Sequence, residues 1–362
     1  MEGIQHECGI AALYQLPGGD VSKLIPGQNP NNVHRLIPRM LIDMQNRGQL
    51  AAGMTSYQPE RIELLETYKE IGTVMEAFRL SRSDKMEKIL NDHSGRAAIG
   101  HVRYATSGSD DNSRSYAQPF ERKHGCKWKW FSFAFNGQLA NFEHLRSELL
   151  KSADYHLVRD NDTEVIMHYI SHQLGQVNDR PSLKEVFTRL SSLFDGAYNI
   201  VYLNALGDMV VMRDPKGIRP LSYAIDGNFF GAASENIALS NLGFQNIQVL
   251  EPGEMIVIED GKLEKFRYAP KQASAHCFFE WVYFANAAST IDHKSVYLTR
   301  VALGKALAKQ QLERNDVVID EDTIVVPVPD TAAWCRRCHG TGIEHPLYGR
   351  IDEEPCGWPH LH

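Results

Sequence analysis

Four short apolar segments follow one another between residues 198 and 234, and they constrain the fold more than any other feature. The segments YNIVYL, MVVMR, LSYAI and FFGAAS are separated by turn residues such as Asp, Pro and Gly. Short apolar segments between such turns are typical of β-strands with tight connections. We therefore expect an antiparallel sheet here, closed by a strand and hairpin at LEPGEMIVIEDGKL, residues 250–263.

The earlier part of the chain mixes strands with helices. Strands are expected at residues 8–14, 97–106 and 131–141, the last of them breaking at an Asn-Gly turn. Helices are expected at residues 33–48, 141–150 and 162–174. In the first of these helices the apolar side chains recur at helical spacing, at Ile37, Met40, Leu41 and Met44.

A second unit is expected towards the end of the chain. Residues 264–276 are polar and are typical of a linker. Residues 295–312 predict a helix with Val296, Leu303 and Leu307 on one stripe. The apolar run TIVVPVPD, residues 323–330, is typical of a strand buried in a parallel sheet. We therefore expect an α/β domain to begin near residue 277.

The composition excludes several classes of protein. The chain has 362 residues, 43% of them hydrophobic, which is enough for two domains with a large core. A net charge of −7 with no basic tract argues against a nucleic-acid partner. No apolar run approaches the roughly 18–20 residues that span a bilayer, so no membrane partner is expected. The first seven residues do not resemble a secretory signal, and six cysteines do not make a disulfide scaffold. We expect a cytoplasmic protein with reduced thiols.

The residues that suggest chemistry are spread over four segments. Cys8 opens the first strand, Arg103 and Thr106 follow another strand, Asn136 precedes a bare glycine, and Asp162 begins a helix. Each has an ordinary structural interpretation as well, because a cysteine on an apolar strand is usually a core residue and Asn-Gly is often only a turn. Their joint occurrence favours a catalytic site.

These residue types fit the hydrolysis of the glutamine amide. If Cys8 became the first residue, its α-amine, with a pKa of about 7.7–8.0, would act as the base for its thiol. The Asn136 side chain and the Gly137 N–H would donate to the oxyanion. Arg103 could hold the α-carboxylate of glutamine as a planar fork, and Asp162 could pair with its α-ammonium group.

Several motifs resemble those of a known family. The motifs are CGI, QNRGQLAAGM, GHVRYATSG, FNGQLAN, DNDTE, RDPKGIRPL and ASEN. Together they are similar to the class II glutamine amidotransferase domain, an N-terminal-nucleophile hydrolase. The segments RDPKGIRPL, EPGEM and FFEWVYFANAASTID narrow the resemblance to the amidophosphoribosyltransferase family, over about residues 8–333.

The resemblance implies a fold and a domain order. It implies an α+β protein whose glutamine amidotransferase domain, residues 8–263, is a four-layer αββα sandwich preceded by a propeptide at residues 1–7. A linker at 264–276 would then lead to the incomplete start of an α/β phosphoribosyltransferase domain at 277–333. Residues 334–362 match nothing in the family, and we expect them to be an aberrant or disordered tail.

The resemblance also implies residue roles and partners. Cys8 would be the nucleophile after removal of residues 1–7. Arg103, Thr106 and Asp162 would bind glutamine, while Asn136 and Gly137 form the oxyanion hole. Ammonia would pass inside the protein to phosphoribosyl pyrophosphate and give 5-phosphoribosylamine, the first step of purine synthesis. The family also tends to form homo-oligomers.

The chain departs from the family pattern in two ways. Family members usually have His where Asn46 and Phe135 stand and Asp where Leu50 stands, which we expect to affect the packing around Arg47. More importantly, no strand with paired aspartates and a glycine-rich phosphate loop occurs, and Ala332 replaces a serine near the Mg²⁺ site. We therefore expect a truncated or frame-shifted chain that does not bind phosphoribosyl pyrophosphate productively.

Because of the same departures, we expect no metal cofactor, and two alternative functions stay open. The resemblance implies Mg²⁺ at the synthase site of the full-length family and a 4Fe–4S cluster in some members, but we expect neither in this chain. Cys277 matches the position of only one cluster ligand, and we expect it to be a buried thiol. The Cys335/Cys338 pair has zinc-ligand spacing but lacks a second pair. The alternatives are another class II amidotransferase, such as one that aminates a sugar phosphate, and a non-catalytic remnant that binds a partner or a metal.

Overall fold

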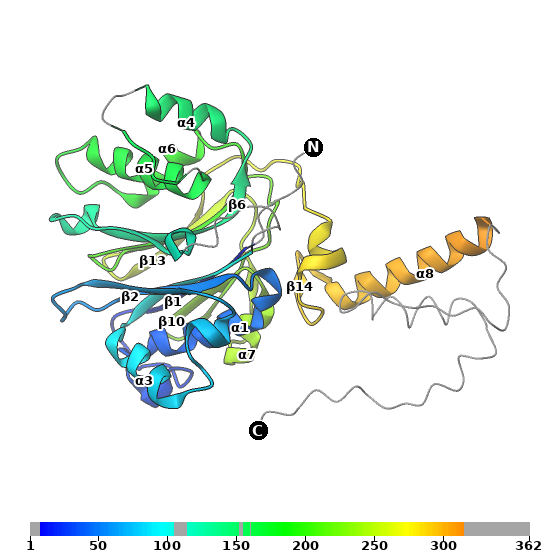
Figure 1. The fold of residues 1–362 in the computed structure, drawn as a ribbon, viewed down its shortest axis with the longest axis horizontal. Helices are drawn as coiled ribbons and strands as arrows, with labels where there is room; N and C mark the ends of the chain where they lie inside the picture. Colours follow the sequence, from blue (N-terminus) through cyan, green and yellow to red (C-terminus); the bar gives the residue numbers. More distant parts are fainter. Residues whose placement is uncertain (1–7, 105–113, 152–154, 160, 315–362) are drawn as a thin grey trace.

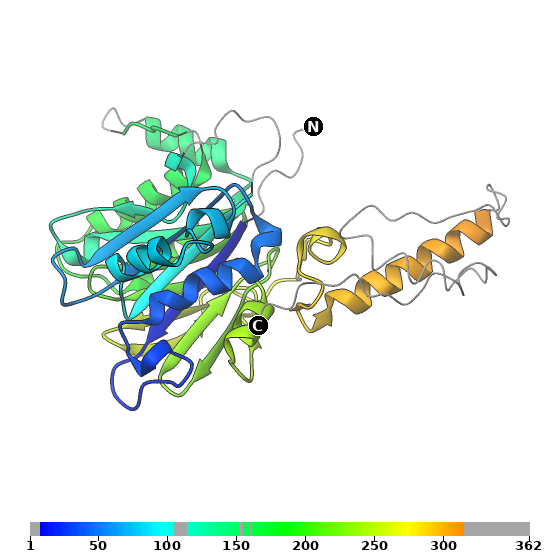
Figure 2. The same cartoon turned by 60° about the horizontal axis from the view of Figure 1, so that its bottom comes forward.

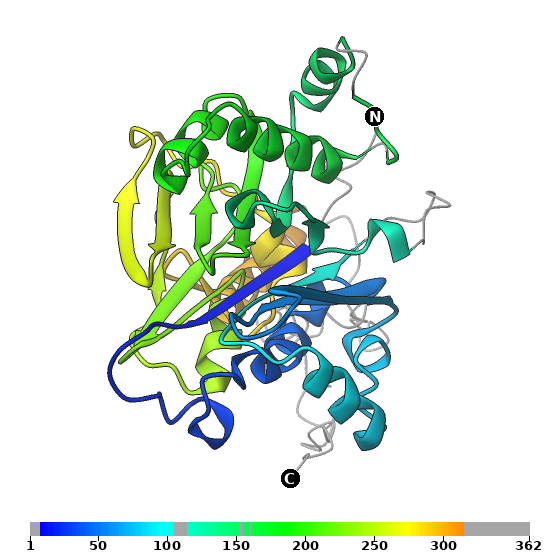
Figure 3. The same cartoon turned by 90° about the vertical axis from the view of Figure 1, so that its left-hand side faces the viewer.

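The computed structural model describes residues 8–104, 114–151, 155–159 and 161–314. Within these residues two large β-sheets lie face to face, and helices cover the outer face of each sheet (Figure 1). Figure 3 shows the same layers from the left-hand side of Figure 1, with the two groups of helices outermost. The four-layer αββα arrangement implied by the resemblance is therefore confirmed.

The first sheet has seven strands in the described part of the chain, all paired antiparallel. In spatial order these are β11 (Gln248–Val249), β9 (Ser222–Asp226), β10 (Phe229–Ala233), β1 (Cys8–Gln15), β4 (Ala97–Arg103), β2 (Ala51–Tyr57) and β3 (Leu65–Ile71). In the central strand β1, Ile10 and Ala12 face the second sheet, whereas Ala11 and Leu13 face the outer helices. Burial on both faces explains the continuous apolar run.

The second sheet has six strands within the described ranges, and its pairs are also antiparallel. In spatial order these are β13 (Lys262–Arg267), β12 (Glu254–Glu259), β8 (Met209–Arg213), β7 (Gly196–Asn204), β6 (Phe131–Leu139) and β5 (Phe120–Arg122). Along β7, Ile200 and Tyr202 pack against the outer helices, while Val201 and Leu203 pack between the sheets. The alternation places the inner strands of this sheet between two cores.

The helices form the two outer layers. The first sheet is covered by α1 (Ile37–Asp43), α2 (Val74–Ala77), α3 (Ser83–Asp92) and α7 (Asn236–Leu242). The second sheet is covered by α4 (Phe142–Leu150), α5 (Asp162–Gly175) and α6 (Leu183–Ser191). Short 3₁₀ segments lie at Pro26–Gln28, Val33–Leu36, Gln45–Arg47, Arg114–Tyr116 and Lys127–Lys129. The helix expected over residues 33–48 is therefore a short α-helix between two 3₁₀ turns, with its predicted apolar side chains buried.

The four apolar segments of residues 198–234 do not form one sheet, so that expectation is wrong. β7 and β8 belong to the second sheet, whereas β9 and β10 belong to the first. The chain crosses from one sheet to the other along RDPKGIRPL, residues 213–221. Strands buried on both faces look alike in sequence, because their patterns report burial and not which strand they pair with.

The hairpin that follows these strands is longer than expected. β12 pairs with β13 from Glu254↔Arg267 to Glu259↔Lys262, so residues 264–267 are part of the second sheet rather than of a linker. The strand β13 is polar because it lies at the edge of the sheet and is largely exposed, and its polar sequence led to the expectation of a linker.

A smaller unit follows the sandwich. It consists of a π-helical turn (Glu280–Phe284), the hairpin of β14 (Thr290–Ile291) and β15 (Lys294–Ser295), and the helix α8 (Val296–Arg314). Figure 2 shows α8 extending away from the two sheets. Among the helices of the described residues, none is long and apolar enough to cross a lipid bilayer.

The helix α8 is present as expected, but its buried stripe differs from the prediction. Leu303 and Leu307 are exposed, and the buried positions are Val296, Arg300, Gly304 and Ala308. Arg300 is buried because its guanidinium donates to the carbonyl oxygens of Trp281 (2.8 Å) and Ala285 (2.7 Å). Satisfied hydrogen bonds thus make the burial of a charged side chain possible at this one position of the stripe.

Candidate active site

Cys8 and Arg103 lie side by side at one end of the first sheet. The antiparallel register of β1 and β4 places Cys8, the first residue of β1, opposite Arg103, the last residue of β4. The backbone of Gly48 approaches this end closely, since a Cβ at Gly48 would lie 2.4 Å from the carbonyl carbon of Arg103. The expected position of Arg103 at a strand end is confirmed, and packing against Gly48 holds it there.

The thiol of Cys8 is buried, with 6% of the residue exposed. Burial raises the pKa of this thiol to about 11, because a thiolate loses its hydration there. A backbone hydrogen bond from Tyr104 and the positive charges of Arg103 and Arg219 act in the opposite direction, while Asp162 adds to the rise. The thiol is therefore protonated at neutral pH, and its use as a nucleophile needs a base.

We expect Cys8 to resist alkylation in a chain that retains residues 1–7. A thiol with a pKa of about 11 is ionised in roughly one molecule in a thousand at pH 8. Labelling with iodoacetamide between about pH 7 and pH 11, followed by mass spectrometry of the peptides, measures this. The control is Cys126, which is only partly buried. Labelling of Cys8 at pH 8 as fast as that of Cys126 would contradict the prediction.

Asn136 and Gly137 lie inside a strand and not in a turn after it. β6 continues through both residues, and Asn136 pairs with Asn199 of β7. The expectation that the strand breaks at Asn-Gly is therefore wrong. Glycine is needed here for a different reason, because a Cβ on Gly137 would lie 2.0 Å from the carbonyl oxygen of Ala197. Close approach of the neighbouring strand explains the residue type.

Ser234 links Asn136 to the strand that carries Cys8. The Asn136 Nδ2 group donates to Ser234 Oγ over 3.2 Å, and the Ile10 backbone N–H donates to the same oxygen over 3.0 Å. In return, the Ser234 backbone N–H donates to the Ile10 carbonyl oxygen over 3.0 Å. An amide nitrogen carries two N–H groups, so Asn136 keeps one to donate to a substrate oxygen.

Asp162 begins α5, as expected. The helix is capped by Asn161, whose side-chain oxygen accepts from the Glu164 backbone N–H over 2.9 Å. Asp162 Oδ2 accepts from the Leu139 backbone N–H over 3.3 Å, at the last residue of β6. The start of α5 is therefore fixed against the end of the strand that carries Asn136.

Gln118 ties these two elements together in the interior. Its Oε1 atom accepts from the Phe135 backbone N–H over 2.7 Å. Its Nε2 group donates to the Phe135 carbonyl oxygen and to Thr163 Oγ1, both over 3.4 Å. Phe135 precedes Asn136 and Thr163 follows Asp162, so one buried amide positions the neighbours of two predicted site residues.

Arg103 is half-buried, and its guanidinium carbon lies 5.3 Å from the centre of the Tyr116 ring. A cation over an aromatic face is held in place without losing its charge.

Thr106, the other residue predicted beside Arg103, lies outside the described residues. The remaining predicted residues gather at one end of the two sheets, namely Cys8, Arg103, Asn136, Gly137 and Asp162.

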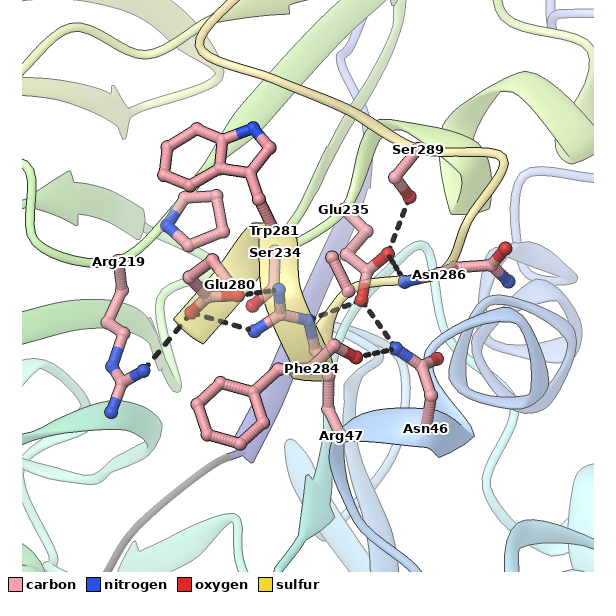
Figure 4. A network of polar contacts seen from close by, with 12 residues as sticks. Asn46, Arg47, Arg219, Ser234, Glu235, Glu280, Trp281, Phe284, Asn286 and Ser289 are labelled. Carbon is pink, nitrogen blue, oxygen red and sulfur yellow. Dashed lines mark hydrogen bonds and ion pairs between the residues drawn. The ribbon is translucent and has the colours of Figure 1, made fainter. Parts of the chain in front are cut away.

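A buried ion network lies behind the start of β1 (Figure 4). Arg47 is fully buried, with its Nε atom 2.5 Å from Glu235 Oε1 and its Nη2 atom 2.5 Å from Glu280 Oε2. A Cβ added at Gly9 would lie 3.5 Å from the Arg47 side chain, so Arg47 packs directly against the residue after Cys8. The network therefore supports the strand that carries the thiol.

Further groups complete this network. Arg219 Nη1 lies 3.2 Å from Glu280 Oε1. Asn46 donates to Glu235 Oε1 over 2.9 Å, and Ser289 Oγ donates to Glu235 Oε2 over 2.5 Å. Asn46, where the family usually has His, thus contributes directly to the packing around Arg47. The sandwich and the unit that follows it share one set of buried charges.

Several of these residues have no role that the sequence predicts. Arg219 lies in RDPKGIRPL, and Ser234 and Glu235 lie in ASEN. Both motifs support the resemblance, and that was the only signal in the sequence for these positions. Glu280 lies in FFEWVYFANAASTID, which carries the same kind of signal, whereas Gln118 lies in none of these motifs and its contacts depend on residues far away in the chain.

The described residues contain no group of three or more His, Cys, Asp or Glu side chains that could hold a metal ion. Cys277 is partly exposed, so the expectation of a buried thiol is wrong there. It begins the turn before the π-helical segment, where the Glu280 backbone N–H donates to its carbonyl oxygen over 3.1 Å. The Cys335/Cys338 pair lies outside the described residues.

Comparisons with known proteins agree with this architecture. A family model described as a glutamine amidotransferase domain matches residues 66–247. An amidophosphoribosyltransferase from Methanothermobacter thermautotrophicus is 32% identical over 331 residues, which cover 91% of this chain and 62% of that protein. The amidophosphoribosyltransferase of Escherichia coli is 34% identical over 313 residues, covering 83% and 58%. The chain thus spans about 60% of the length of these relatives.

Two solved structures are similar over most of the chain. One is the glutamine phosphoribosylpyrophosphate amidotransferase from B. subtilis in complex with ADP and GMP, which is 26% identical with a TM-score of 0.73. The match covers 96% of this chain and 69% of that one. The other, described as the allosteric regulatory enzyme of purine biosynthesis, is 26% identical with a TM-score of 0.75 and covers 96% and 68%.

Proposed function

This chain belongs to the glutamine amidotransferase domain family, and from that premise we propose that it hydrolyses the side-chain amide of glutamine to glutamate and ammonia. The observation that carries the proposal is the position of Cys8, which lies beside Arg103 on a strand that Ser234 joins, through Ile10, to Asn136. A thiol, an amide donor and a guanidinium in this arrangement suit acyl transfer from a substrate that carries both an amide and a carboxylate.

The first step needs a base for the protonated thiol. Cleavage of the Glu7–Cys8 bond frees the α-amine of Cys8, whose pKa of about 7.7–8.0 suits proton transfer near neutral pH. The amine takes the thiol proton and becomes an ammonium group. That positive charge next to the sulfur favours the thiolate and offsets the effect of burial on the pKa of Cys8.

The thiolate then attacks the amide carbon of glutamine, and the carbonyl oxygen becomes an oxyanion. The Asn136 Nδ2 group and the Gly137 backbone N–H donate to this oxygen. When the intermediate collapses, the Cys8 ammonium returns a proton to the leaving nitrogen, and ammonia departs. A thioester on Cys8 remains, and water hydrolyses it to glutamate with the same amine as base.

Arg103 and Asp162 select a free amino acid as the substrate. The planar guanidinium of Arg103 pairs with the α-carboxylate, and the Asp162 carboxylate pairs with the α-ammonium group. Thr106 adds a hydroxyl contact. The fixed start of α5 and the fixed end of β4 keep these two charges at a constant separation.

The acceptor of the ammonia is the second part of the proposal. The names of the relatives support phosphoribosyl pyrophosphate as the acceptor, with 5-phosphoribosylamine as the product of the first step of purine synthesis. Passage through an enclosed path keeps ammonia from being protonated in water. The alternative acceptor is a different sugar phosphate, such as a hexose phosphate.

We expect the purified protein to begin at Cys8 and to release glutamate from glutamine. Intact mass spectrometry identifies the first residue, and a coupled glutamate assay measures hydrolysis. The same assay with phosphoribosyl pyrophosphate or a hexose phosphate identifies the acceptor. A chain that begins at Cys8 but releases no glutamate would contradict the proposal. A chain that begins at Met1 and is inactive would support the non-catalytic alternative.

A further inference from the structure

A cavity of about 420 Å³ opens at the edge of the sandwich, and none of the described residues that line it belongs to the candidate active site. It lies between β3, the edge strand of the first sheet, and β5, the edge strand of the second. The lining consists of Thr67, Lys69, Arg114, Ser115, Glu121 and Arg159. A cavity of this size accommodates a small organic molecule.

Three of the lining side chains are cationic, although the whole chain has a net charge of −7. Lys69 Nζ and the Arg159 guanidinium both lie over the Phe120 ring, 4.9 and 5.0 Å from its centre. Burial, and then repulsion from Arg159 and Arg114, lowers the pKa of Lys69 to about 8. These cations are therefore held close together at an electrostatic cost that a bound anion relieves.

The carboxylate in the lining, Glu121, offsets part of this positive charge and by itself raises the pKa of Lys69. Glu121 Oε2 accepts from Thr67 Oγ1 over 2.6 Å, and Glu121 Oε1 accepts from Trp130 Nε1 over 2.8 Å. Both oxygens are thus engaged by neutral donors. With three positive charges and one negative charge, the lining keeps a net charge of two positive units.

Two further carboxylates stand next to the cavity but outside its lining. Glu164 lies 3.7 Å from Arg159 Nη1, and its oxygens accept from the backbone N–H groups of Val158 and Arg159. Glu70 lies 4.0 Å from Arg114 Nε. The Nε atom of Arg159 is buried and has no hydrogen-bond partner in the described part of the chain. A buried donor of this kind calls for an acceptor.

We propose that this cavity binds a phosphate monoester, with the phosphate between Lys69, Arg114 and Arg159. Lys69, Arg114 and Arg159 present cationic donors to one cavity, and guanidinium groups pair with phosphate oxygens in a bidentate geometry. Lys69 Nζ donates to two carbonyl oxygens, those of Ala117 and Pro119, and retains a third proton for the ligand. The remaining volume takes the organic part of the ester. The proposal does not depend on glutaminase activity.

Isothermal titration at constant ionic strength tests the proposal, with ribose 5-phosphate, inorganic phosphate and L-glutamate as probes. We expect ribose 5-phosphate to bind more tightly than inorganic phosphate, and L-glutamate to bind weakly. Arg159→Gln and Lys69→Met should each weaken ribose 5-phosphate binding by roughly tenfold or more, since each removes a charged hydrogen bond. The matched controls are Arg82→Gln and Lys85→Met, because both residues are exposed and lie outside the cavity.

A further variant distinguishes a loss of binding from a loss of folding. The Arg114 side chain is 60% exposed, so Arg114→Gln preserves the fold and should also weaken binding. Absence of ribose 5-phosphate binding up to about 10 mM would overturn the proposal. Equal weakening in the control variants would overturn it as well. Displacement of ribose 5-phosphate by L-glutamine would assign the cavity to the glutamine site and so reject a separate phosphate site.

Discussion

The Cys8→Ala protein is expected to release glutamate from glutamine at least about 10⁴-fold more slowly than the unaltered protein, because loss of a catalytic nucleophile leaves only binding and oxyanion stabilisation. Cys126 and Cys277, the other cysteines of the described residues, cannot replace it. Neither lies on β1, the strand that Ser234 joins to Asn136.

The comparison is cleanest when processing cannot differ between the two proteins. Both chains should begin at residue 8 after removal of an initiator methionine, so that each has a free α-amine. Cys126→Ala is the matched control and should keep its activity. Equal thermal melting of the three proteins would show that the fold is retained. Substantial glutamate release by Cys8→Ala would mean that the nucleophile is elsewhere.

Arg47→Met is expected to lower the free energy of unfolding by about 3–5 kcal/mol, the usual cost of removing one partner of a buried ion pair. The change leaves the carboxylates of Glu235 and Glu280 buried without their shared cation. Glu235 then lies buried without the cation that pairs with it, and Glu280 keeps only Arg219, so the buried negative charge is poorly compensated. Urea denaturation followed by tryptophan fluorescence measures it.

Arg35→Met provides the control for this prediction. Arg35 pairs with Glu87 over 3.0 Å, but both side chains reach solvent, so we expect a loss of about 1 kcal/mol or less. A second check is the double variant Arg47→Met with Glu280→Met, which removes cation and carboxylate together and should cost less than the sum of the single changes. Similar small losses in Arg47→Met and Arg35→Met would show that the network contributes little.

Much of the local structure was predictable from the sequence. The strand at Cys8, the strand end at Arg103 and the helix start at Asp162 are all found where the pattern places them. Each depends on apolar spacing or on capping within a few residues. The same local reasoning failed at Asn136, because an Asn-Gly pair inside a buried strand has the same sequence as a turn.

The errors share one physical cause. The sequence of β7 to β10 shows how strongly each strand is buried, but not which sheet it joins. On α8 the apolar residues Leu303 and Leu307 are exposed, and Arg300 is buried because distant carbonyl oxygens satisfy it. In both cases the outcome depends on residues far away in the chain, which the hydrophobic pattern of a single element does not record.

The sequence by itself determined the strands and helices, the resemblance to glutamine amidotransferases and the set of residues that can carry the chemistry. Only the tertiary structure decided which strands share a sheet, that Ser234 joins Asn136 to the strand of Cys8, and that Arg47 is held between two carboxylates. Arg47 and Glu235 are separated by 188 positions in the chain. Contacts over such distances form only when the whole sandwich folds, because they depend on the mutual placement of elements and not on the pattern within any one of them.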